Sequence, residues 1–119
     1  MSKFRFIFIA LLFWAGLAFF SYKTIAQSNE IEVLRDIEYA KPNGVSLKLD
    51  VCRPKGLSAS RPGMVLIHGG GFRTDDKKAL LDECQELAKL GYVAATVNYR
   101  FAPTYPYPAQ IDDVQYAVR

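Results

Sequence analysis

The clearest pattern along the chain is an alternation of apolar and polar residues between positions 45 and 52. One face carries Val45, Leu47, Leu49 and Val51, and the other carries Ser46, Lys48, Asp50 and Cys52. A period of two predicts a strand with one buried side and one solvent-facing side. The turn-forming sequence Pro-Asn-Gly precedes it, so we expect this strand to pair with one near residues 37–39 as a hairpin.

Residues 64–67 are continuously apolar, which is typical of a strand covered on both faces, and residues 92–97 predict another short apolar strand. Between them, over residues 77–90, apolar residues recur with a helical period and form one face: Leu80, Cys84, Leu87 and Ala88. Asp75 and Asp76 precede this helix and Gly91 follows it, as expected for an N-cap and a C-terminal stop. Strand, helix and strand with short links predict a parallel βαβ unit.

A last helix is expected to begin near Pro108, with Ile111, Val114 and Val118 on its apolar face. The order of elements predicts an α/β fold that is incomplete, because the final parallel strand would be left as an open apolar edge. We therefore expect residues 37–119 to form the N-terminal part of a larger domain.

The first 26 residues have the order of a secretory signal peptide. Lys3 and Arg5 precede an apolar run over residues 6–20, and a more polar stretch ends at Ala26, where cleavage is expected. The run is shorter than the roughly 20 residues of a spanning helix. A secreted or periplasmic protein is therefore predicted, and membrane contact is expected only if this segment stays uncleaved. Residues 27–36 are polar and predict a flexible leader.

Charge and cysteine content narrow the classes of partner. The chain has 15 basic and 12 acidic residues, and three of the bases lie in the first 26 residues, so the remainder has 12 of each. Because those bases are scattered, no nucleic-acid partner is predicted. Cys52 and Cys84 are compatible with a disulfide in an oxidising compartment or with two separate thiols. With a single histidine they form no metal set, and no metal or cofactor is predicted.

The chain's only histidine, His68, is followed by Gly69, Gly70 and Gly71 at the end of an apolar strand. Glycine N–H groups are open to close approach, and two such donors can stabilise an oxyanion. His68 lacks a serine in a G-x-S-x-G context to activate, and it lacks further metal ligands, so support of the loop is its favoured role. The sequence matches no phosphate-loop motif. A plain glycine turn is the remaining alternative.

Residues 37–119 resemble the N-terminal portion of an α/β-hydrolase of the esterase/lipase type, whose oxyanion loop reads HGGG. The resemblance rests on His68 to Phe72, on VNYRFAP at 97–103 and on YPYPAQIDDVQYAVR at 105–119. It implies an oxyanion hole made by the N–H groups of Gly70 and Gly71, with Gly69 and His68 as support. Phe72 would line the acyl pocket or pack in the core.

The same resemblance implies a scaffold of Tyr99, Arg100, Asp112 and Asp113, in which Arg100 bonds a carboxylate of the last helix. Charge at a helix N-terminus explains the two acids equally well. In this family the catalytic serine, acid and histidine follow the last helix seen here. None of that triad is present in the chain, so the 119 residues alone are expected to be inactive.

The resemblance thus implies a fragment of an exported carboxylic-ester hydrolase that acts on a small-molecule, polysaccharide or lipid ester. Amide and peptide substrates stay open. The alternative is a non-catalytic hydrolase-like binding protein, or a membrane-anchored interaction protein.

Overall fold

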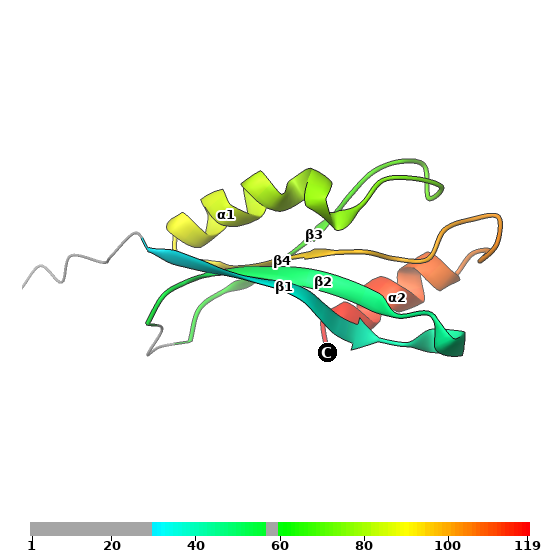
Figure 1. Ribbon diagram of the computed structural model, residues 1–119, viewed down its shortest axis with the longest axis horizontal. Coiled ribbons are helices and arrows are strands. Elements are labelled where there is room, and N and C mark those ends of the chain that lie inside the picture. The colour runs from blue at the N-terminus through cyan, green and yellow to red at the C-terminus, as the bar shows by residue number, and fades with distance from the viewer. Residues whose placement is uncertain (1–29, 57–59) are drawn as a thin grey trace, which may run out of the picture.

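The computed structural model describes residues 30–56 and 60–119, which form one mixed sheet with a helix on each face (Figure 1). The predicted signal peptide, 1–26, and residues 27–29 of the predicted leader lie outside the described residues. The elements in chain order are β1 (Ile31–Ala40), η1 (Pro42–Gly44), β2 (Leu47–Pro54), β3 (Gly63–Ile67), η2 (Lys77–Leu80), α1 (Leu81–Lys89), β4 (Val93–Val97) and α2 (Ala109–Ala117).

The sheet has the strand order β1-β2-β4-β3. β2 is antiparallel to both β1 and β4, whereas β3 and β4 run parallel with α1 between them in the chain. The predicted hairpin and the predicted βαβ unit are therefore confirmed. Asp76 caps η2 by accepting a hydrogen bond from the Lys78 N–H, and Gly91 follows α1 at a φ of 95°.

The prediction of a flexible leader is wrong for residues 31–36, because β1 begins at Ile31. Ile31 pairs with Pro54 and Val33 pairs with Cys52, so β2 supplies partners for residues 31–34, before the register shifts between Leu34 and Ile37. Ile31 and Val33 also pack against the apolar core.

The prediction that β2 has one wet side is also wrong, because Asp50 and Cys52 are fully buried. Helix α1 covers that face, and a core of Cys52, Cys84, Ala88 and Ala94 lies between helix and sheet. Cys52 and Cys84 form a disulfide whose Cα atoms are 5.7 Å apart. The structure thereby decides between the two states that the sequence leaves open for the cysteines.

Two predictions about the end of the chain need correction. The strand left at the edge of the sheet is β3, since β4 lies between β2 and β3. The predicted apolar face of α2 is not its buried face: Ile111 and Val118 are 46% and 68% exposed, and the buried residues are Gln110 and Asp113. Helix α2 is held to the sheet by polar side chains, because its neighbours there are backbone groups of the loop after β4.

None of the helices in residues 30–56 and 60–119 is both long and apolar enough to cross a bilayer.

Candidate active site

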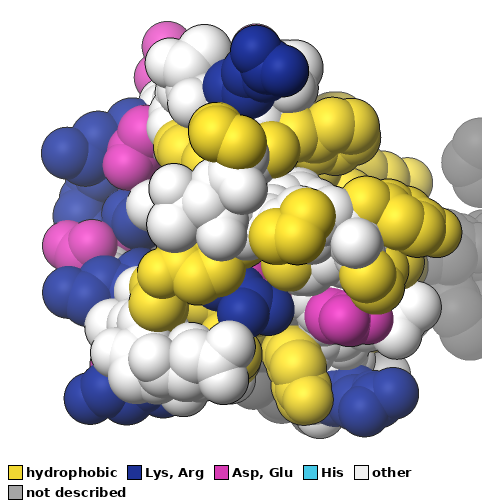
Figure 2. All heavy atoms as spheres, turned by 90° about the vertical axis from the view of Figure 1, so that its right-hand side faces the viewer, with side chains coloured by type: hydrophobic (Ala, Val, Ile, Leu, Met, Phe, Trp, Pro, Cys, Tyr) yellow, Lys and Arg dark blue, Asp and Glu magenta, His cyan; other side chains and the backbone are white. Residues whose placement is uncertain are grey.

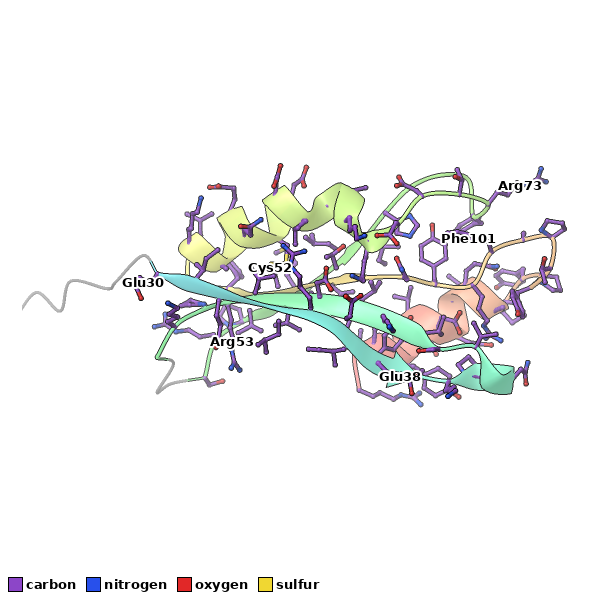
Figure 3. The ribbon with its side chains drawn as sticks, in the orientation of Figure 1. Glu30, Glu38, Cys52, Arg53, Arg73 and Phe101 are labelled. Carbon is purple, nitrogen blue, oxygen red and sulfur yellow. A yellow bond between two sulfur atoms is a disulfide. The ribbon has the colours of Figure 1, made fainter. Side chains whose placement is uncertain are left out.

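The three glycines form a loop beyond the carboxyl ends of β3 and β4, at the end of the molecule where Figure 3 labels Arg73 and Phe101. Gly70, Gly71 and Phe72 all have a positive φ, of 100°, 61° and 62°. A Cβ at Gly70 would lie 2.2 Å from the Thr74 carbonyl oxygen, so only glycine fits there. Gly71 has open space around it.

His68 lies under the loop and is 3% exposed. Its Nδ1 is 2.9 Å from the Gly69 carbonyl oxygen, and its ring stacks on Tyr99 with centroids 4.6 Å apart. Phe101 contacts the same ring edge-on. Within the described residues its Nε2 has no hydrogen-bond partner. This buried, stacked imidazole lies in a position suited to bracing the loop.

The Tyr99 hydroxyl orients the first peptide groups of the loop. It donates to the carbonyl oxygens of His68 and Gly69, at 2.9 and 3.1 Å. Burial, followed by the nearby Asp75 carboxylate, raises the pKa of Tyr99 above 10.0, which keeps the hydroxyl protonated as a donor. Because C=O and N–H point in opposite directions across a trans peptide, the bond to the Gly69 oxygen turns the Gly70 N–H away from Tyr99.

A tight turn orients the next peptide group. The Arg73 N–H donates to the Gly70 carbonyl oxygen at 3.1 Å, and the Ala102 N–H donates to the Phe72 carbonyl oxygen at 2.9 Å. Among the described residues, the N–H groups of Gly70 and Gly71 donate to no protein acceptor, and both residues are exposed. The loop therefore presents two backbone donors that are open to a ligand.

Arg100 and Asp113 form the main ion pair behind the loop. The guanidinium Nε and Nη2 donate to the carboxylate at 2.7 to 3.1 Å, and the Arg100 backbone N–H donates to it at 2.9 Å. The hydrogen bond that Arg100 donates to Asp113 is the main cause that raises the pKa of Arg100. Asp112, by contrast, is exposed in the first turn of α2. The structure brings Arg100 to Asp113 and leaves Asp112 at the surface.

Three residues that sequence reasoning did not single out also hold this end of the sheet. Gln110 donates to the carbonyl oxygens of Arg100 and Tyr105, at 3.0 and 2.7 Å. Lys77 is buried against Asp50, with 2.6 Å between Nζ and Oδ1. No pattern in the sequence marks them, since a lysine or glutamine near a helix start is ordinarily exposed.

An apolar pocket of about 210 Å³ lies beside the loop, between the β3 edge and α2. Its lining consists of Ile67, Phe72, Tyr99, Gln110, Ile111, Val114 and Gln115. Phe72 lies in this lining rather than in the core and is 55% exposed. Figure 2 looks onto this end of the molecule and shows hydrophobic side chains gathered over its centre and right, with Lys and Arg along its left side.

Within the described part of the chain, no three His, Cys, Asp or Glu side chains come close enough to hold a metal ion.

Comparison with known proteins shows what this arrangement is similar to. The BD-FAE family model matches residues 49–119. Tuliposide A-converting enzyme 2 of Tulipa gesneriana is 33% identical over 88 residues, which is 66% of this chain and 22% of that enzyme. Esterase LipI of Mycobacterium tuberculosis is 37% identical over 62 residues, or 51% of this chain and 19% of LipI. The chain thus spans about a fifth of the length of these curated relatives.

Solved structures give the same picture in three dimensions. Esterase Est2 of Thermogutta terrifontis superposes with a TM-score of 0.65 at 25% identity, over 73% of this chain and 31% of that one. A bacterial heroin esterase superposes with a TM-score of 0.59 at 28% identity, over 74% of this chain and 27% of that one.

Proposed function

The chain belongs to the BD-FAE family of esterase-type α/β-hydrolases, and its sheet and helices are part of that fold. From this premise we propose that it is the oxyanion-binding portion of an exported serine hydrolase that cleaves carboxylic esters. The observation that carries the proposal is the pair of free N–H groups on a loop held in positive φ at the carboxyl end of a parallel strand. Ligands of open α/β sheets bind beyond those strand ends.

The proposed chemistry is acyl transfer to a serine. When a serine oxygen attacks the ester carbonyl carbon, the C=O π electrons move to the carbonyl oxygen. The N–H groups of Gly70 and Gly71 donate to that oxyanion, and each such donor is worth about 3 to 4 kcal/mol in the transition state. The catalytic histidine takes the serine proton and gives it to the departing alkoxide as the tetrahedral intermediate collapses, so the alcohol leaves. Water then attacks the acyl-serine by the same route and releases the carboxylic acid.

The residues behind the loop act as support in this proposal. Tyr99 fixes the peptide that carries the Gly70 N–H, and His68 fills the space beneath it. His68 is not the general base, because its ring is buried and stacked against Tyr99 and Phe101. The nucleophilic serine, the acid and the catalytic histidine are proposed to lie in sequence beyond Arg119 of the complete protein.

The substrate is proposed to be a small-molecule, polysaccharide or lipid ester, with Phe72 on the side of the acyl group. Export is supported by the disulfide, because such bonds persist in oxidising compartments. Residues 1–26 are then the signal peptide. N-terminal sequencing of the mature protein is expected to begin at Gln27, and a start at Met1 would argue for a retained anchor.

The direct test is ester hydrolysis by the complete protein that carries these residues, with p-nitrophenyl acetate and butyrate as probes. We expect Gly70→Ala to lower kcat at least about a hundredfold, because it displaces an oxyanion donor. Gly63→Ala is the matched control, since its Cβ would meet only an ordinary contact at 3.9 Å. A folded complete protein that neither hydrolyses the probes nor reacts with a serine-directed phosphonate would favour a non-catalytic binding role.

A further inference from the structure

A buried lysine at the far end of the glycine loop has no role in the chemistry described so far. Lys77 is 3% exposed, and it is the first residue of η2, directly after the loop. Burial of an ammonium group is costly unless the group is paired and hydrogen-bonded. Its position and its partners therefore need an explanation.

The Lys77 side chain bridges the two strands of the hairpin. Its Nζ lies 2.6 Å from Asp50 Oδ1 on β2 and 3.2 Å from Asp36 Oδ1 on β1. The Asp36 N–H donates to the same Asp50 oxygen at 2.8 Å. Asp36 has a φ of 56° and falls where the β1–β2 register shifts. A strained backbone position is thus maintained where it completes this cluster.

The Lys77 backbone is fixed as firmly as its side chain. Its N–H donates to Asn98 Oδ1 and its carbonyl oxygen accepts from Thr96 Oγ1, both at 2.6 Å. Burial lowers the pKa of Lys77, but the hydrogen bonds that its ammonium group donates to Asp50 and Asp36 outweigh that effect, so its pKa is raised above 10.5 and the group stays charged. One residue therefore ties the end of the loop to β1, β2 and the end of β4.

The loop is then anchored at both ends. Tyr99 holds its beginning through the His68 and Gly69 carbonyl oxygens, and Lys77 holds its end. Glycine residues have wide conformational freedom, so a segment with three of them is ordered only if its ends are fixed.

We propose that the Asp36–Lys77–Asp50 cluster is a positioning device for the oxyanion loop. By fixing the end of the loop, it holds the Gly70 and Gly71 N–H groups where the transition state needs them. This inference rests on the proposed function. It assigns to two carboxylates of the hairpin, the buried Asp50 and the more exposed Asp36, a role in positioning a loop that follows β3.

The test uses the complete protein and two variants of the cluster. Lys77→Met/Asp50→Asn removes both buried charges together, which avoids leaving one of them unpaired. Asp36→Asn is milder, because that side chain is 60% exposed, and it serves if the double variant does not fold. Lys78→Met is the matched control, since Lys78 is the adjacent lysine and is exposed.

Two readouts are compared: amide hydrogen exchange of residues 68–76, and kcat and KM for p-nitrophenyl esters. We expect faster exchange in that segment and a kcat lower by about tenfold to a hundredfold in the double variant, with KM within about twofold. A smaller change of the same sign is expected for Asp36→Asn. Lys78→Met should match the wild type.

A purely structural role predicts a different result. The variant Cys52→Ala/Cys84→Ala is expected to lose stability through removal of the disulfide between β2 and α1 while it keeps the cluster, so it serves as the reference for a loss of stability alone. If the cluster variants lower kcat no more than this reference does, or leave exchange in 68–76 unchanged, the inference is overturned. If the wild type hydrolyses no ester, the proposed function fails instead, and the exchange data alone decide whether the cluster holds the loop.

Discussion

The two ends of the sheet are stabilised by different kinds of interaction. At the amino end of β4, the core consists of Cys52, Cys84, Ala88 and Ala94, closed by a disulfide. At the carboxyl end, apolar residues such as Leu49 and Val97 are also buried, but beside them lie buried polar or charged residues: His68, Lys77, Thr96, Asp113 and Gln110. Figure 3 shows the separation, with Cys52 near one end of the sheet and Phe101 at the other.

This difference teaches what each kind of interaction can specify. The free energy gained by burying apolar side chains is roughly proportional to the buried area and depends little on direction. Apolar burial therefore stabilises the packing of α1 on the sheet without orienting single peptide groups. Hydrogen bonds depend on angle, so a hydroxyl or carboxylate fixes the particular carbonyl or N–H that it meets. The polar end of the sheet is the one where peptide orientation matters for the proposed oxyanion site.

The largest effect is expected from breaking the Arg100–Asp113 pair. Arg100→Met leaves the fully buried Asp113 carboxylate without its cation, which should cost about 3 to 5 kcal/mol in the free energy of unfolding. Urea denaturation of the complete protein measures this cost. Arg73→Met removes an exposed arginine of the same end and should change stability by less than about 0.5 kcal/mol. Equal effects of the two would mean that Asp113 finds another partner.

The apolar end should respond in stability alone. Cys52→Ala/Cys84→Ala removes the disulfide and is expected to cost about 2 to 4 kcal/mol in the free energy of unfolding. Because this core packs α1 on the sheet and includes no residue of the glycine loop, kcat for an ester probe should stay within about twofold of wild type. A large loss of kcat in protein that is still folded would contradict the division between the two ends.

Tyr99→Phe should give the opposite result at the polar end, a modest loss of stability with a clear loss of rate. The hydroxyl makes two hydrogen bonds, and its removal should cost about 1 to 3 kcal/mol in the free energy of unfolding. Because the Gly69–Gly70 peptide would no longer be held in one orientation, kcat should fall about tenfold with little change in KM. Tyr107→Phe, at an exposed tyrosine, is the control and should leave both quantities unchanged.

The sequence alone predicts the apolar end of the sheet better than the polar end. The apolar runs of β3 and β4 and the helical period of α1 locate these elements along the chain, so the hairpin and the βαβ unit were predictable. The prediction that residues 64–67 are covered on both faces is wrong, because Met64 and Ile67 are 39% and 50% exposed on the edge strand β3. The fold class followed from their order and from the resemblance. The fully buried side of β2 escaped prediction because the charge on Asp50 reads as solvent-facing, and its partner Lys77 is distant in the sequence.

The candidate site was likewise predictable from the sequence only in part. The motif His68 to Phe72 marks the loop, but no sequence signal shows that the Tyr99 hydroxyl meets its carbonyl oxygens or that Gln110 bonds the loop after β4. The buried face of α2 was mispredicted for this reason, since its contacts are specific hydrogen bonds rather than a periodic apolar stripe. Directional bonds between distant residues leave no periodicity to detect.

The smallest expected effect is a pH dependence confined to the polar end. The hydrogen bond from Lys77 is the main cause that lowers the pKa of Asp36 below 3.8, with weaker help from Lys48 and Lys78. A carboxylate with a lowered pKa stabilises the fold above its unfolded pKa, and this contribution is lost as pH falls through the folded value. Asp36 is largely exposed, so the effect should be small and should weaken further in high salt.

The melting temperature of Asp36→Asn should therefore fall less steeply below about pH 4 than that of wild type. If the melting temperatures of the two proteins fall equally steeply in this acid range, Asp36 adds nothing to the cluster, and Asp50 is the one carboxylate that holds the Lys77 ammonium group.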